Sequence, residues 1–148
     1  MAKALITTVP FGENNRLPLD LLENAGIEYS INPYNNKLTE DQLLELVGDF
    51  DVLIAGTEPI TDKVMAQVSK LRLISRVGIG LDSVDLIAAK KRGIKVSYTP
   101  DAPAPAVAEL TIGMILTLLR SVHISNTQMH YGKWERIFGR RLNKITVG

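Results

Sequence analysis

The sequence predicts an α/β protein built on a parallel sheet, and three observations support this prediction. Over the first hundred residues, β-like runs alternate with amphipathic stretches of about ten residues, the pattern of βαβ units. The chain has 148 residues, 45% of them hydrophobic and 22% charged, which is the composition of a globular protein. It has no cysteine, which excludes disulfides, thiolate catalysis and cysteine-bound metal centres.

Strand-like and helical segments follow one another in regular order. The expected strands are residues 4–9, 27–31, 51–55, 73–77 and 94–98. The expected helices are residues 17–24, 39–48, 61–69 and 83–92. Gly26 and Gly93 stand where C-terminal caps belong, and Thr39 and Thr61 open the second and third helices. Because crossover connections are right-handed, we expect a flavodoxin-like, doubly wound sheet of five strands in the order 2-1-3-4-5.

The pattern changes after the fifth strand. Three prolines within Thr99–Pro105 predict a stiff connector that leads into a long helix, Ala106–Arg120. We therefore expect one domain over residues 1–100 and, over residues 101–148, a linker, a crossing helix, an extended arm and the start of a further, truncated domain. The helix is apolar on nearly every side, so a second domain, a second subunit or both must cover it. Glu109 is interpreted as a carboxylate that stabilises the helix start.

Charge and hydropathy narrow the class of protein further. Lys and Arg number 17 against 16 Asp and Glu, so a strongly basic, polyanion-binding protein is excluded and no nucleic-acid partner is expected. The longest apolar stretch, Val107–Leu119, contains Glu109 and is shorter than the roughly 20 residues that span a bilayer. The N-terminus lacks a signal-peptide pattern. We expect a soluble, cytoplasmic protein with no membrane partner.

The best candidate site is the loop Val77, Gly78, Ile79 and Gly80. It follows a strand and precedes a helix, so its amides and the positive helix end can hold a carboxylate or phosphate. Asp82 is the expected N-cap of that helix, with Asp85 in a capping-box-like role. A plain tight turn remains the alternative. The loop is not the dinucleotide fingerprint G-x-G-x-x-G, because its third glycine position is Ser83.

Other site types find no support in the sequence. The chain contains neither a G-x-x-x-x-G-K-[S/T] phosphate loop nor a G-x-S-x-G nucleophile elbow. His123 and His130 are the only histidines and have no third ligand nearby, so no metal site is assigned. The basic segment 133–144 is typical of a solvated arm, with attraction for an anionic partner as the alternative.

Several motifs occur together in a familiar order. They are R-V-G-I-G-L-D-S-V-D from Arg76, T-P-D-A-P-A-P-A-V-A-E-L from Thr99, L-L-R from Leu118 and G-K-W from Gly132. With them, the chain resembles the NAD-dependent D-2-hydroxyacid dehydrogenases, oxidoreductases that include phosphoglycerate dehydrogenase and glyoxylate/hydroxypyruvate reductase. The resemblance implies a two-domain enzyme with a Rossmann cofactor domain and a substrate-binding lid. It also implies that Val77, Gly78, Ile79 and Gly80 contact the substrate carboxylate, and that the long helix and the Trp134 arm form a dimer.

The resemblance also sets limits. Thr146–Gly148 matches the opening of the family's first cofactor strand, and the family's NAD loop and catalytic Arg, Glu and His lie beyond that point. No catalytic or cofactor-binding residue is therefore assigned, and we expect a truncated substrate-binding and dimerisation half that is inactive alone. Phosphoglycerate-specific members place basic residues near the positions of Ala55–Thr57, so a smaller 2-hydroxy or 2-oxo acid is expected here. The alternative is a non-catalytic, flavodoxin-like module that binds anions or partners.

Overall fold

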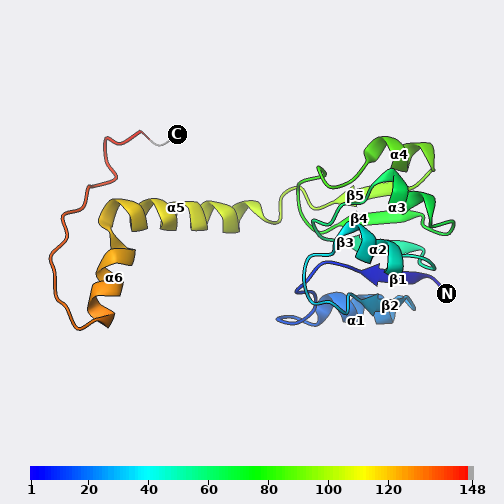
Figure 1. Cartoon of the computed structure of the whole chain (residues 1–148), viewed down its shortest axis with the longest axis horizontal. Coiled ribbons are helices and arrows are strands. Elements are labelled where there is room, and N and C mark those ends of the chain that lie inside the picture. Colours follow the sequence, from blue (N-terminus) through cyan, green and yellow to red (C-terminus); the bar gives the residue numbers. More distant parts are fainter. Residues whose placement is uncertain (147–148) are drawn as a thin grey trace. The chain divides into compact units, whose positions relative to one another are not determined.

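The computed structural model describes residues 1–146 and divides into two compact units, one over Met1–Ala102 and one beginning at Pro103. Figure 1 shows the first unit as a sheet with its helices and the second as two helices followed by an irregular segment. The strands are β1 (Lys3–Ile6), β2 (Glu28–Ile31), β3 (Val52–Ala55), β4 (Leu73–Arg76) and β5 (Lys95–Tyr98). The helices of the first unit are α1 (Leu17–Asn24), α2 (Glu40–Leu46), α3 (Asp62–Ala66) and α4 (Leu86–Lys91).

The five strands form one parallel sheet with the order β2-β1-β3-β4-β5. This confirms the predicted fold class and strand order. The core lies where α2, α3 and α4 meet the central strands, and it joins Leu43 and Val64 of the helices to Leu53 and Ile74 of the sheet. Ala4, Leu5 and Ile6 of β1 are all buried, and β1 is an inner strand between β2 and β3.

The local signals of the first three helices act as the sequence indicates. Helix α1 has the predicted bounds, and Gly26 takes a positive φ of 66° just after it. At α2, the Thr39 side chain accepts from the Gln42 amide, and the Gln42 side chain accepts from the Thr39 amide, which is a complete capping box. The Thr61 side chain accepts from the Val64 amide and opens α3.

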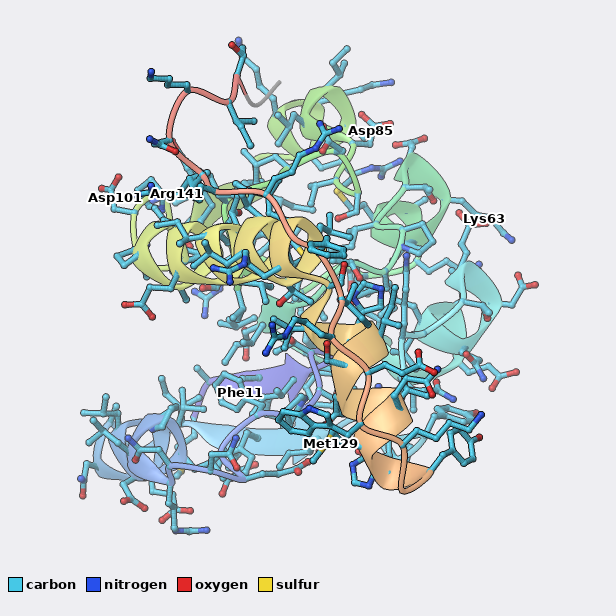
Figure 2. All side chains as sticks on the ribbon, turned by 90° about the vertical axis from the view of Figure 1, so that its left-hand side faces the viewer. Phe11, Lys63, Asp85, Asp101, Met129 and Arg141 are labelled. Atoms are coloured by element: carbon cyan, nitrogen blue, oxygen red, sulfur yellow. The ribbon has the colours of Figure 1, made fainter. Side chains whose placement is uncertain are left out.

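Helix α4 begins later than predicted, and the predicted cap is wrong. Asp85, labelled beside the green ribbon of α4 in Figure 2, is the N-cap, and its Oδ1 accepts from the Ala88 amide at 2.9 Å. The cause is a long-range contact. The Ile60 amide donates to the Ser83 carbonyl at 2.7 Å, and the Asp85 amide donates to the Ile60 carbonyl at 3.0 Å, in an isolated parallel bridge between Ile60 and Val84. The Val84 amide also donates to the Leu81 carbonyl at 2.9 Å, so Ser83 belongs to a turn and Val84 to the bridge, and the helix starts only after them.

The second unit contains α5 (Ala104–Arg120) and α6 (Val122–His130), which meet at Ser121 with a left-handed φ of 53°. Helix α5 starts two residues before the predicted Ala106, because Pro105 needs no amide partner in the first turn. Glu109 therefore lies beyond the first turn, and its interpretation as a helix-start carboxylate is wrong.

Part of the expected arm is helical, because α6 occupies residues 122–130. Residues 133–141 have no regular secondary structure. The strand expected from Ile145 is not present at Ile145 and Thr146, and its remaining residues, 147–148, lie outside the described part of the chain. Over residues 1–146, no single helix is long and apolar enough to cross a membrane; α5 and α6 meet that length and composition only as a pair bent by 67°.

Candidate functional site

The candidate site lies in the first unit, where β1, β3 and β4 end side by side. The register pairs Ile6 with Ile54 and Ala55 with Arg76, so the loops that follow these strands are neighbours. In doubly wound sheets, ligands bind at this carboxyl edge. Two cavities lie here, and we call them cavity A and cavity B.

Cavity A has a volume of about 200 Å³ and cavity B about 230 Å³. Cavity A is lined by Thr7, Thr8, Val9, Lys37, Gly56, Thr57, Glu58, Arg76 and Val77. Cavity B is lined by Thr57, Arg76, Gly80, Asp82 and Ser83. Because Thr57 and Arg76 line both, the two cavities adjoin each other.

The glycine loop runs beside these cavities, and the fold already uses half of its amides. The Val77 amide donates to the Ala55 carbonyl at 2.9 Å, which extends the sheet by one bond. The Gly78 amide donates to Thr99 Oγ1 at 2.8 Å, and the Thr99 amide donates back to the Gly78 carbonyl at 3.1 Å. Within residues 1–146, the amides of Ile79 and Gly80 make no hydrogen bond. Of the four candidate residues, these two are therefore the ones with an N–H available for a ligand.

The expected help from a helix terminus is absent. Helix α4 starts at Leu86, beyond the Ile60–Val84 bridge, so its first turn does not follow directly on the loop. Asp82, which was expected to cap that helix, is exposed and lines cavity B instead. The Asp82 carboxylate repels an anionic ligand in cavity B, so another group has to supply the positive potential that such a ligand needs.

Arg76 supplies that potential from below the loop. It is the last residue of β4 and only 8% exposed, and its Nη1 donates to the Val77 carbonyl. Its Nε is buried and has no hydrogen-bond partner within the described residues. Gly78 has a φ of 138°, and a Cβ at this position would lie 2.5 Å from Arg76 Nη1. The backbone conformation therefore favours glycine, and a side chain here would also have to displace the guanidinium group.

Glu58 is a site residue that the sequence analysis did not identify. It is 1% exposed, and its Oε1 accepts from the Thr7 hydroxyl and from the Gly56 amide, the latter at 3.0 Å. It makes no ion pair within residues 1–146. No local signal marks Glu58 in the sequence, because a charged residue in a loop between a strand and a helix is ordinary, and its burial follows only from the fold.

Lys37 and Arg76 bring positive charge to cavity A from two other segments. Ala55–Thr57, the segment in which basic residues were considered from the sequence, contains none. The fold brings both cations beside Thr57, because Lys37 follows β2 and Arg76 ends β4. The cavity thus combines two cations, one carboxyl group and three threonine hydroxyls, an arrangement suited to a small polar molecule.

The glycine loop, from Val77 to Ser83, does not fit a dinucleotide. The third glycine position of the fingerprint is Ser83, whose carbonyl is held in the bridge to Ile60 rather than at a helix start.

The other candidate residues from the sequence lie in the second unit. His123 and His130 are exposed on α6, and Trp134 is 83% exposed. Over the described residues, no group of three potential metal ligands is present.

Comparison with known proteins identifies the family of this chain. The model of a family described as "D-isomer specific 2-hydroxyacid dehydrogenase, catalytic domain" matches residues 11–143. The chain belongs to the D-isomer specific 2-hydroxyacid dehydrogenase family. Among relatives of this dehydrogenase family, it is 34% identical over all of its length to D-3-phosphoglycerate dehydrogenase of Methanocaldococcus jannaschii, covering 28% of that protein. It is 37% identical over 75% of its length to hydroxypyruvate reductase of Thermotoga maritima, covering 37% of that protein.

Solved structures agree with this dehydrogenase assignment. An NAD⁺-bound 3-phosphoglycerate dehydrogenase of Entamoeba histolytica superposes with a TM-score of 0.76 and 26% identity, over 96% of this chain and 44% of the other. An NAD-dependent formate dehydrogenase of Staphylococcus aureus, in complex with NAD, gives a TM-score of 0.71 and 29% identity, over 90% and 43%. The chain thus spans less than half the length of each of these dehydrogenases.

Proposed function

We propose that the first unit is the substrate-binding part of an NAD-dependent D-2-hydroxyacid dehydrogenase, which interconverts 2-hydroxy and 2-oxo acids by hydride transfer. The observation that carries this proposal is the pair of adjacent amides at Ile79 and Gly80, which make no hydrogen bond within residues 1–146, in a loop whose Gly78 lies against the buried Arg76. Two neighbouring N–H groups are the backbone arrangement that receives a carboxylate. Family membership supports the same ligand class.

In this proposal, the substrate carboxylate accepts hydrogen bonds from Ile79 and Gly80. Arg76 adds positive charge from a buried position, where a charge is screened less than at the surface. The exposed Asp82 on cavity B works against the anion. With two amides, one indirect cation and one opposing carboxylate, we expect weak affinity, on the order of millimolar.

NAD is the cofactor that we propose for the whole enzyme, as in the two relatives solved with it. The Val77–Ser83 loop does not fit a dinucleotide, so we propose no cofactor-binding residue among those described. We propose that the 148-residue chain is inactive on its own. We also propose that α5 and the segment after it form a homodimer, since no residue of α5 is buried within the chain.

The proposal is tested by titrating the chain with glycolate, D-lactate and sulfate while its amide NMR signals are recorded. Signals of residues 77–82 should shift, with Ile79 and Gly80 shifting most, and the loops at Gly12 and Gly48 should serve as internal references. If the anions shift none of residues 77–82, or shift the basic segment 133–144 instead, the loop is an ordinary turn and the proposed substrate site is wrong.

A further inference from the structure

Cavity A contains two buried charged groups that the protein leaves incompletely paired. Arg76 Nε is buried without a hydrogen-bond partner, and Glu58, 1% exposed, makes no ion pair within the described residues. Glu58 accepts both of its hydrogen bonds through Oε1, and Oε2 accepts none within the described residues, although Arg76 Nε, unlike Oε2, is fully shielded from solvent. Buried polar groups are nearly always hydrogen-bonded, and one left without a partner lowers stability. An occupant of the cavity that completes these bonds is therefore favoured.

Both groups are fixed in place before any ligand arrives. The Thr7 hydroxyl and the Gly56 amide hold Glu58 through Oε1, and the buried Gly56 approaches so closely that a Cβ there would lie 2.9 Å from Oε2. The bond from Nη1 to the Val77 carbonyl holds Arg76. A site whose polar groups are already oriented loses little conformational entropy on binding and discriminates well between similar ligands.

The chemistry of the two groups selects the occupant. The group that fits has to donate to Glu58 Oε2 and accept from Arg76 Nε, and a hydroxyl group does both. A methyl group does neither. A fully ionised phosphate only accepts, so it pairs with Arg76 but faces the carboxyl oxygen of Glu58. An ammonium group only donates, so it faces the guanidinium group unfavourably.

The position of cavity A links it to the substrate. It adjoins cavity B through Thr57 and Arg76, and Gly80, one of the two residues proposed to bind the carboxylate, lines cavity B. A 2-hydroxy acid held at Gly80 therefore has room to extend its tail past Thr57 into the cavity that Glu58 lines. We propose that Glu58 is a specificity-determining residue that selects 2-hydroxy acids with a hydroxylated tail. This inference rests on the proposed function and names the substrate class of that same site.

The experiment compares D-glycerate with D-lactate, which differ by one tail hydroxyl, in NMR titrations of the full chain. We expect D-glycerate to bind about tenfold more tightly, equivalent to about 1.4 kcal/mol. The Gly56 amide, which donates to Glu58, should shift with D-glycerate and not with D-lactate. In Glu58→Gln, a donor replaces the acceptor Oε2, so the affinity ratio should fall to within about twofold while Ile79 and Gly80 still respond to both acids.

Glu40→Gln is the matched control. Glu40 also accepts from a threonine hydroxyl, that of Thr61, but it lines neither cavity, so this variant should keep the wild-type ratio. Three outcomes would overturn the role of Glu58 and leave the carboxylate site standing. They are equal affinities of the wild-type chain for the two acids, an unchanged affinity ratio in Glu58→Gln, and tighter binding of 3-phosphoglycerate than of D-glycerate. If neither acid shifts the signals of Ile79 or Gly80, the proposed function fails. If Glu58→Gln does not fold, the response of the Gly56 signal in the wild-type chain still tests the role of Glu58.

Discussion

At the scale of single residues, the two glycines of the loop have different roles although they look equivalent in the sequence. Gly78 has a φ of 138° and lies against Arg76 Nη1, whereas a Cβ on Gly80 would meet only Asp82 Oδ2, at an ordinary 3.5 Å. We expect Gly78→Ala to lower the free energy of unfolding by about 1–3 kcal/mol because it strains the backbone. Gly80→Ala should change it by less than about 0.5 kcal/mol. Urea unfolding of both variants measures the difference, and equal losses would contradict it.

Asp51 gives a pH-dependent contribution at the opposite edge of the sheet. The Lys3 amide, which donates to Asp51 Oδ2 at 2.9 Å, holds the pKa of this carboxyl below its usual value, and Arg72 lowers it further. A carboxyl whose pKa is lower in the folded state stabilises the fold above the unfolded pKa of about 3.9, and that stability is lost as the pH falls through the folded pKa. Stability should therefore fall between pH 5 and pH 2 in the wild-type chain, and less so in Asp51→Asn.

The urea midpoint at several pH values measures this effect. Asp101→Asn is the control, because Asp101 is an exposed carboxylate without an ion pair in the described part of the chain. The control should follow the wild-type pH profile. A profile for Asp51→Asn as steep as that of the wild type would show that the Lys3 contact contributes nothing.

Single residues are also where prediction from sequence was least complete. The loop Val77–Gly80 could be singled out because its signal is local: two glycines between a strand and a helix. Cavity A could not, because Lys37, Glu58 and Arg76 come from three segments that only the parallel pairing of β2, β1, β3 and β4 brings together. The sequence could not show which amides of this loop are available for a ligand either. Those of Val77 and Gly78 are occupied by Ala55 and Thr99, which are distant in the sequence.

At the scale of elements, the corrected start of α4 makes a testable difference between two aspartates. Asp85 Oδ1 accepts from the Ala88 amide, whereas Asp82 lies in the loop and caps nothing. Asp85→Ala should therefore lower the free energy of unfolding by about 1 kcal/mol, the usual loss for an N-cap. Asp82→Ala should stay within about 0.5 kcal/mol of the wild type. The reverse order in thermal or urea unfolding would restore the interpretation made from the sequence.

The elements predicted well are those whose ends are encoded locally. Helix α1 matches its predicted bounds, and the capping box at Thr39 and Gln42 marks the start of α2. Helix α4 is different, because the Ile60–Val84 bridge takes up backbone groups of its first predicted turn. No pattern within residues 83–92 reveals that bridge, since its other half is more than twenty residues away in the sequence.

At the scale of the whole molecule, the 148-residue chain should neither oxidise nor reduce 2-hydroxy or 2-oxo acids by itself. Hydride transfer needs the cofactor and the substrate held together, and our proposal assigns only a substrate site to the described residues. NADH consumption with glyoxylate and hydroxypyruvate measures this, and turnover by the purified chain above a blank would refute it. A D-2-hydroxyacid dehydrogenase with all its domains, assayed in parallel, is the positive control.

The second unit carries an apolar surface that the chain itself does not bury. Six large apolar side chains of α5 are between 41% and 71% exposed, namely Val107, Leu110, Ile112, Met114, Leu116 and Leu118. Contiguous apolar patches of more than a few hundred Å² are seldom left in water, and a two-fold dimer is the commonest way to cover one. We therefore expect the purified chain to be a dimer by light scattering at micromolar concentration.

Charge on this helix should break the dimer. Leu116→Glu or Leu118→Glu would place a carboxylate in an apolar contact, where it has to be desolvated without a partner, so monomers or aggregates should form. Ile87→Glu is the matched control, because Ile87 is an apolar residue 84% exposed on α4, in the other unit, and its change should leave the dimer intact. A monodisperse monomer of the unmodified chain would exclude α5 as a self-association surface, and a dimer that Ile87→Glu disrupts instead would place the contact on the first unit.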